Sequence, residues 1–160
     1  MLRVVTRAEM RSGSLLHRAV YVLVVSSDGG RLLVHRRADW KDLWPGRWDV
    51  CFGGVAGVGE PGAATARREL AEEVGIVSGP LERLGAGGYA DGEVRVLGEV
   101  FLVRSDGPFA FADGEVVETA WVAVPGLAAW LAAGRAVCPD GVAIALPLLR
   151  ATAGPPRQSV

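Results

Sequence analysis

The feature that most constrains this chain is the stretch at residues 54–76, GVAGVGEPGAATARRELAEEVGI. Pro61 suits the first position of a helix, because its missing N–H would have no partner there. Gly75 suits the left-handed residue that ends a helix. Between them, apolar residues recur at helical spacing at Ala63, Ala66, Leu70 and Val74. The stretch therefore predicts a helix that packs one face on a sheet and turns its acids away from the core.

Three glutamates, Glu69, Glu72 and Glu73, share another face of this predicted helix. Offsets of three and four residues place them within roughly 100° around the helix axis. Like charges at these offsets destabilise a helix by about 0.2–0.5 kcal/mol per pair. A hard divalent cation held by oxygen ligands is the simplest remedy, so the stretch predicts a metal site.

Composition limits the class of protein. The 160 residues, half of them hydrophobic, fit one domain with one core, and we predict a domain at residues 1–153 and a disordered polar tail at residues 154–160. Seventeen basic and 18 acidic residues give a net charge of −1, which argues against a nucleic-acid polymer or a membrane as partner. A small-molecule partner is expected, and both a monomer and a homodimer remain open.

Cellular location is predicted from apolar runs and cysteines. The apolar run at residues 19–25 is too short to cross a bilayer, and no charged leader precedes a cleavage site. Cys51 and Cys138 match no metal-ligand spacing and are expected as thiols in a reducing compartment. Both observations predict a cytoplasmic protein.

Strands are expected on both sides of the central helix. Two of them form a hairpin, at residues 19–26 and 31–35, joined by the turn signal Asp28-Gly29-Gly30. A loop with three tryptophans follows at residues 36–48. The other predicted strands are at residues 2–6, 49–52, 81–90, 93–104 and 119–124, and further helices at 125–133 and 139–149. This order predicts an α/β/α sandwich with a mixed sheet.

The stretch also matches a known motif at every defining position. These positions are Gly54, Glu60, Arg68, Glu69, Leu70, Glu72, Glu73, Gly75 and Ile76. The chain thus resembles the Nudix hydrolase superfamily of MutT-like proteins, because they are the positions of the Nudix box. A solvated acidic helix, the alternative, would not explain the fixed glycine and arginine positions.

The resemblance implies a Nudix fold and metal-dependent cleavage of a phosphoanhydride in a nucleoside diphosphate derivative or related diphosphate. Glu69, Glu72 and Glu73 would hold Mg²⁺ or Mn²⁺, with Gly53 offering its backbone carbonyl. Glu69 would also polarise the attacking water. Arg68 and Glu60 would support these carboxylates. Cations suit this reaction, because water must approach a group that already carries negative charge.

Many Nudix enzymes add a metal-binding carboxylate from outside the box. The downstream acids are Glu93, Glu99, Asp106, Asp113, Glu115 and Glu118. We favour Glu115, in the loop before the strand at Trp121, over Glu99, which would point from a strand toward the site. An ordinary surface acid is the alternative for each.

The run HRRADWKDLWPGRWD, at residues 35–49, extends the resemblance to the isopentenyl-diphosphate-isomerase-like branch. In the isomerase a basic pair four residues apart binds the diphosphate, and Arg37 and Lys41 match it. The alternative is a solvated basic loop. The three tryptophans of the loop would stack on a base or pack the loop, and packing is favoured.

Two other functions are alternatives to hydrolysis. An isoprenoid diphosphate isomerase is disfavoured, because Gly53 stands where the isomerase has its active cysteine and Val55 where it has a metal-binding histidine. A ligand-sensing Nudix domain without turnover typically lacks box glutamates, and this chain keeps them all. Hydrolysis is therefore the favoured function, with the substrate left open.

Overall fold

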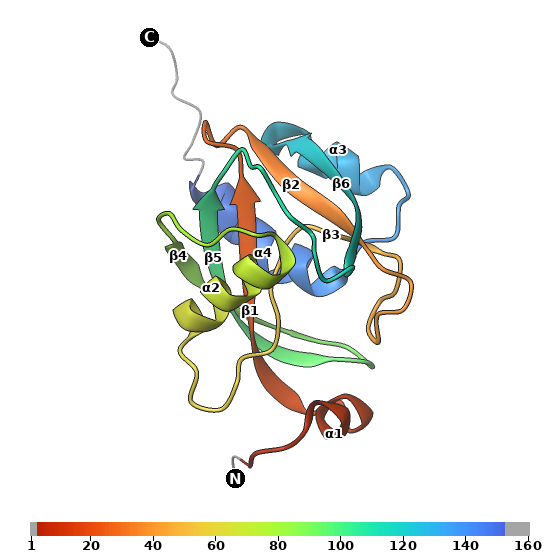
Figure 1. Ribbon diagram of the computed structural model, residues 1–160. Coiled ribbons are helices and arrows are strands. Elements are labelled where there is room, and N and C mark those ends of the chain that lie inside the picture. The colour runs from red at the N-terminus through yellow and green to blue at the C-terminus, as the bar shows by residue number, and fades with distance from the viewer. Residues whose placement is uncertain (1–2, 153–160) are drawn as a thin grey trace.

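The computed structural model describes residues 3–152, in which six strands form one mixed sheet (Figure 1). The strand order is β3-β2-β1-β5-β4, with β6 paired to β2. β1 and β5 are parallel and the other pairs antiparallel. The strands are β1 (Leu16–Val25), β2 (Arg31–Arg37), β3 (Trp48–Asp49), β4 (Glu82–Ala90), β5 (Arg95–Arg104) and β6 (Val116–Ala123).

Helices cover both faces of this sheet (Figure 1). Val20, Val22 and Val24 of β1 pack in one core cluster with α2, while Tyr21, Leu23 and Val25 pack in a second cluster with α4. A strand buried on both faces reads as a continuous apolar run, as β1 does. The predicted α/β/α sandwich is confirmed. The helices are α1 (Arg7–Ser12), α2 (Gly62–Glu73), α3 (Leu127–Ala132) and α4 (Pro139–Thr152), with a 3-10 turn η1 at Val124–Gly126.

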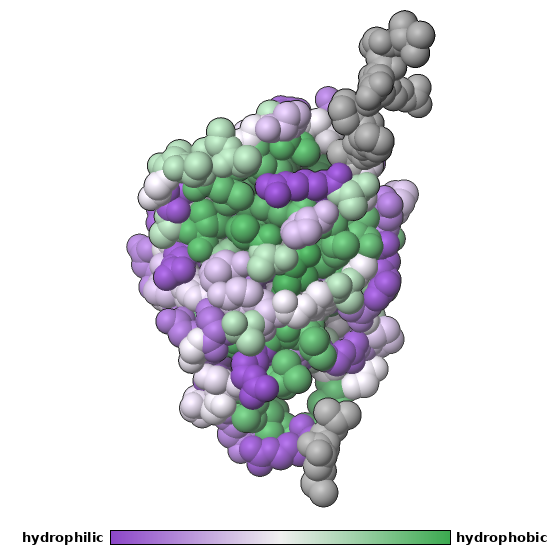
Figure 2. All heavy atoms as spheres, turned by 180° about the vertical axis from the view of Figure 1, so that it is seen from behind, coloured by the Kyte–Doolittle hydropathy of each residue, from purple (hydrophilic) through white to green (hydrophobic). Residues whose placement is uncertain are grey.

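The predicted strands and helices after residue 18 are confirmed with shifted ends. The hairpin forms by pairing of Val25 with Leu32. The strand expected at residues 49–52 is reduced to β3, and Phe52 adds one bridge to Val22. Seen from behind, apolar side chains gather over the upper half, where α3 and α4 lie (Figure 2). Among the described residues, no helix is both long and apolar enough to cross a bilayer.

The strand predicted at residues 2–6 is wrong where the structure describes it. Residues 3–6 form no strand, and α1 follows them. The helix starts with a capping box, in which Thr6 Oγ1 accepts from the Glu9 N–H at 3.2 Å and Glu9 Oε2 accepts from the Thr6 N–H at 2.8 Å. The spacing T-x-x-E is a known signal for a helix start. The predicted tail at residues 154–160 lies outside the described residues.

The apolar face predicted for α2 is correct except at its start. Ala66, Leu70 and Val74 are fully buried, but Ala63 is exposed. The buried face of the helix begins at Gly62 instead. Gly62 lies close to β5, since a Cβ on it would lie 2.4 Å from Glu99 Oε1. The helix therefore approaches β5 through its glycine, and the residue after it turns to solvent.

The prediction that the box acids all point away from the core is wrong for Glu73. Its side chain is buried, with 9% exposure. The reason is helical spacing, because Glu73 lies three residues after Leu70 and so falls beside the buried face. The α2 helix thus carries one carboxylate into the interior.

Candidate functional site

Two glycines let the chain pass between β1 and α2. A Cβ on Gly53, whose φ is +141°, would lie 2.1 Å from the Val20 carbonyl oxygen. A Cβ on Gly54 would lie 2.5 Å from Glu69 Oε1. The backbone contact excludes a side chain at Gly53, whereas a side chain at Gly54 would displace the Glu69 carboxylate, so glycine at both positions lets the backbone approach the acids of α2 closely. The Gly53 N–H donates to Glu73 Oε2 at 2.9 Å as a result.

Arg68 joins the other box acids. Its guanidinium donates to both carboxylate oxygens of Glu60 at 3.2 Å, to Glu69 Oε1 at 2.8 Å and to Glu72 Oε2 at 3.3 Å. Glu60 Oε2 also accepts from the Gly57 N–H at 2.9 Å. These hydrogen bonds lower the pKa of Glu60 to about 2. Arg68 therefore ties the loop before α2 to two acids of the helix.

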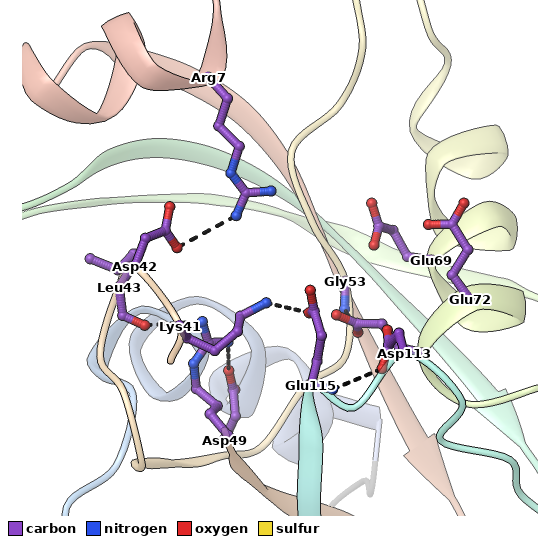
Figure 3. A network of polar contacts seen from close by, with 12 residues as sticks. Arg7, Lys41, Asp42, Leu43, Asp49, Gly53, Glu69, Glu72, Asp113 and Glu115 are labelled. Atoms are coloured by element: carbon purple, nitrogen blue, oxygen red, sulfur yellow. Dashed lines mark hydrogen bonds and ion pairs between the residues drawn. The ribbon is translucent and has the colours of Figure 1, made fainter. Parts of the chain in front are cut away.

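A carboxylate cluster forms where α2 faces the loop before β6. Glu73, Asp113 and Glu115 each offer an oxygen, and these atoms lie within 4.8 Å of one another. Asp113 Oδ1 accepts from the Glu115 N–H at 3.0 Å, which fixes this pair (Figure 3). Glu115 was the favoured outside acid, while Asp113 was an alternative that sequence reasoning passed over. The spacing D-x-E within one loop is the sequence signal that indicates Asp113 as a partner of Glu115.

Burial raises the pKa of Glu73 to about 8, and the charges of Glu69 and Glu115 act in the same direction. Burial also raises the pKa of Glu69. Crowded carboxylates of this kind are stabilised by a divalent cation, and an all-oxygen donor set suits Mg²⁺ and Mn²⁺. The residues present therefore fit the metal that the Nudix box implies, without selecting one ion.

Glu99, the less favoured outside acid, lies apart from this cluster. It forms ion pairs with Arg18 at 3.4 Å and Arg83 at 3.0 Å. Glu72 is the most exposed of the box acids on α2, and its described partner is Arg68. Figure 3 shows the Glu69 and Glu72 side chains next to each other on α2.

The basic residues predicted to bind diphosphate point inward. The Lys41 side chain is 8% exposed, and its Nζ pairs with the Glu115 carboxylate (Figure 3). Arg37 donates to the Leu43 carbonyl at 3.0 Å and lies 3.6 Å from Asp49 Oδ2. The alternative of a solvated basic loop is therefore wrong for these two residues. Both lie beside acids inside the protein.

The tryptophans explain why this loop folds inward. Trp44 is buried, and Trp48 packs edge-on against Trp130 with centroids 5.7 Å apart. Packing, the favoured role, is confirmed for these two. Trp40 is exposed and lies 5.7 Å from Lys41 Nζ. The buried Trp44 and the half-buried Trp48 thus hold residues 38–47 against the core and present Lys41 to the acids.

One cavity of about 600 Å³ connects these groups. Its lining includes the acids of α2 and the loop before β6, and residues of α1. It also includes four residues to which the sequence assigns no role in the site. They are Tyr21, Asp49, Cys51 and Asp140. Both cysteines are buried and free, as expected.

Comparisons with known proteins agree with this arrangement. A family model described as NUDIX domain matches residues 15–138. The uncharacterized Nudix hydrolase YfcD of Escherichia coli (strain K12) is 42% identical over 118 residues, which are 73% of this chain and 64% of YfcD. The uncharacterized Nudix hydrolase PA4841 of Pseudomonas aeruginosa is 36% identical over 136 residues, 85% of this chain and 79% of that protein.

A solved structure supports the fold. DR0079 from Deinococcus radiodurans is 26% identical, with a TM-score of 0.67 over 84% of this chain and 82% of that chain. The chain belongs to the Nudix family. It spans slightly less than two thirds of the length of YfcD. The isopentenyl-diphosphate-isomerase-like branch stays a prediction.

Proposed function

We propose that this protein is a metal-dependent Nudix pyrophosphohydrolase that cleaves a phosphoanhydride bond in a nucleoside diphosphate derivative or a related diphosphate. The observation that carries the proposal is the carboxylate cluster of Glu73, Asp113 and Glu115 beside an intact Nudix box at one wall of a 600 Å³ cavity. A diphosphate brought to this wall needs cations, because acids alone would repel it.

The proposed roles are those that the Nudix box implies. Glu69, Glu72, Glu73 and Glu115, with the Gly53 carbonyl, would hold Mg²⁺ or Mn²⁺, and we add Asp113 to this set. The ions would neutralise the phosphate oxygens. Glu69 would orient the attacking water. Arg68 positions Glu69, and Glu60 in turn fixes Arg68 through two hydrogen bonds.

Lys41 and Arg37 would bind the diphosphate. Lys41 is paired with Glu115, so it already lies where the cluster meets the cavity. A bound diphosphate would offer Lys41 a second anionic partner, while cations take over the charge of Glu115. Phosphate binding by a lysine acting as a point charge is common.

Replacing Lys41 by Ala is expected to raise KM for a diphosphate substrate roughly tenfold or more, the cost of losing one charge-assisted hydrogen bond of about 1.5–3 kcal/mol. Steady-state kinetics at saturating Mg²⁺ provides the measurement. Arg36→Ala is the matched control, since Arg36 pairs with Glu118 and Asp39 at the surface. An unchanged KM and kcat in Lys41→Ala would contradict diphosphate binding by Lys41 and indicate a structural role.

The geometry at Gly53 disfavours the alternative of an isoprenoid diphosphate isomerase. A cysteine there would place its Cβ 2.1 Å from the Val20 carbonyl oxygen. A ligand-sensing domain without turnover remains the second alternative.

We also propose that the protein is a single domain, that it is located in the cytoplasm and that its partner is a small molecule. Its assembly would be a monomer or a homodimer.

The proposal is tested by a substrate screen. Nucleoside di- and triphosphates, nucleotide sugars, dinucleotides and isoprenoid diphosphates are incubated with Mg²⁺ or Mn²⁺, and products are identified by mass. Metal-dependent cleavage of one class is expected. Binding of a compound without turnover under both metals would support the sensing alternative instead.

A further inference from the structure

The N-terminal segment brings three arginines to the cavity. Arg3 precedes α1, Arg7 begins it and Arg11 lies in its last turn, and all three line the same cavity as the carboxylate cluster. Arg37 and Lys41, which line it too, already have a place in the proposed diphosphate site. None of the proposed hydrolytic roles uses the three arginines of the N-terminal segment.

Arg7 and Arg11 share one carboxylate, that of Asp42. Arg7 Nη2 lies 3.5 Å from Asp42 Oδ1, and Arg11 Nε lies 3.4 Å from Asp42 Oδ2. Figure 3 shows Arg7 pointing from α1 toward Asp42. Both distances exceed the roughly 2.7–2.9 Å that is usual for a charge-assisted hydrogen bond. The single carboxylate therefore leaves this pair of arginines with an excess of positive charge.

Two arginines of the cavity also have a buried N–H group without an acceptor. Among the described residues, Arg11 Nε and Arg37 Nε are buried and have no hydrogen-bond partner. Burial lowers the pKa of Arg11, and the positive charges of Arg7 and Arg37 act in the same direction, against the charge of Asp42. A buried donor without an acceptor is costly. An anion with several oxygens would supply both the acceptors and the negative charge.

Lys41 links this basic group to the carboxylate cluster. Its Nζ pairs with Glu115, while the next residue, Asp42, pairs with Arg7 and Arg11. In Figure 3, the Lys41 side chain extends away from Asp42 toward Glu115. A diphosphate held by the cluster and Lys41 would thus leave the arginines of α1 to another part of the same ligand.

We propose that Arg7 and Arg11 bind a phosphate group that the substrate carries in addition to the diphosphate at the carboxylate cluster. This role rests on the proposed function and names its substrate class. A phosphate matches guanidinium groups in charge and in shape, because its oxygens accept parallel N–H bonds from the planar fork. The additional phosphate is either the third in a chain or a separate one on the rest of the molecule.

The alternative is that the two arginines only hold α1 in place. Met10 already anchors this helix, since it is buried with 4% exposure. The Arg7 side chain remains 61% exposed, and an exposed ion pair contributes little to stability. Arg7 therefore keeps its guanidinium accessible to a ligand in the cavity.

The test compares pairs of compounds that differ by one phosphate. ADP and ATP test a third phosphate in the chain, and ADP-ribose and its 2′-phosphate test a separate one. The kcat/KM of each compound is measured with Mg²⁺ or Mn²⁺. The wild type is expected to prefer the more phosphorylated member of at least one pair by about tenfold or more, the scale of one charge-assisted hydrogen bond. The pair that shows the preference locates the additional phosphate.

Replacing Arg7 by Gln should lower this preference about tenfold, because the variant loses the charge that meets the additional phosphate. The change should lie in KM rather than kcat, since the contact is remote from the cleaved bond. Arg18→Gln is the matched control. Arg18 is also an exposed arginine, pairs with Glu99 at 3.4 Å and lies outside the cavity lining, so its replacement should keep the wild-type preference.

Replacing Asp42 by Asn separates ligand binding from a structural role. The variant loses the carboxylate that competes for Arg7 and Arg11, so KM for the preferred phosphorylated compound should fall below the wild-type value. A structural role requires the opposite sign, because Asp42→Asn breaks the same ion pairs as Arg7→Gln. An equal rise of KM in both variants would overturn the inference.

Other outcomes also decide the matter. No preference in either pair, or a preference that Arg7→Gln leaves unchanged, would overturn the inference while leaving the hydrolase intact. If no compound is cleaved, the proposed hydrolysis fails, and calorimetry of the same pairs in Mg²⁺ decides the role of the arginines alone. Tighter binding of a phosphorylated member that Arg7→Gln abolishes supports this role. Equal affinity within both pairs, or no binding of any compound, contradicts it.

Discussion

Replacing Glu73 by Gln is expected to lower kcat by roughly 10²- to 10³-fold, the usual scale when one charged group that stabilises the transition state is lost. Glu73 is the buried member of the carboxylate cluster and belongs to the proposed metal ligands. Glutamine keeps an oxygen for the Gly53 N–H, so the local backbone should stay in place. Steady-state kinetics with Mg²⁺ and with Mn²⁺ measures the effect.

The same substitution should make the metal-free protein more stable at neutral pH. Folding raises the pKa of Glu73 from 4.5 to about 8, so the folded state favours its protonated form. The stability that this proton contributes is full below pH 4.5 and is lost as pH rises through about 8. Glutamine removes this dependence. Thermal unfolding in EDTA across pH 4–9 should therefore show a flatter profile for the variant.

Glu82→Gln is the matched control, because Glu82 is an exposed residue of β4. It should leave both kcat and the pH profile unchanged. Wild-type turnover in Glu73→Gln would remove this residue from the metal site. A variant that is less stable than the wild type in EDTA at pH 8 would contradict the burial argument.

Replacing Gly53 by Ala is expected to destabilise the fold by about 3 kcal/mol or more, the range for severe backbone strain and overpacking. The added Cβ would lie 2.1 Å from the Val20 carbonyl oxygen, at a φ of +141°. Backbone cannot move aside as a flexible side chain can. Gly92→Ala is the control, since nothing lies within 4 Å of a Cβ there. Urea unfolding of both variants measures the difference, and equal midpoints would contradict the prediction.

The regular parts of the fold follow from local patterns. The apolar run in β1, the turn at Asp28 and the helix after Pro61 each carry their own signal, and the structure confirms them. The end of a strand depends on pairing instead. β3 keeps two residues because the chain leaves β2 after Asp49, and Phe52 bridges Val22 of β1 instead.

The site was predictable where one element holds it. Spacing on a single helix places Arg68 among its acids, and the contacts with Glu69 and Glu72 agree. Contacts between distant segments have no such signal. The approach of Lys41 to Glu115 spans 74 residues and depends on the buried Trp44.

Burial was the property least visible in the sequence. Glutamate is rarely buried without a partner, so Glu73 was expected on the surface. Asp140 belongs to no motif, and its approach to Asp49 exists only once β3 and the start of α4 meet.

The most direct test of the central claim is hydrolysis in ¹⁸O-labelled water. With the best substrate of the screen and Mg²⁺ or Mn²⁺, we expect one ¹⁸O in a phosphate group of one product, no product in EDTA, and little product from Glu73→Gln. Label in a phosphate shows that water attacked phosphorus. Product that forms at the same rate in EDTA, or that carries ¹⁸O only on carbon, would contradict metal-dependent phosphoanhydride cleavage.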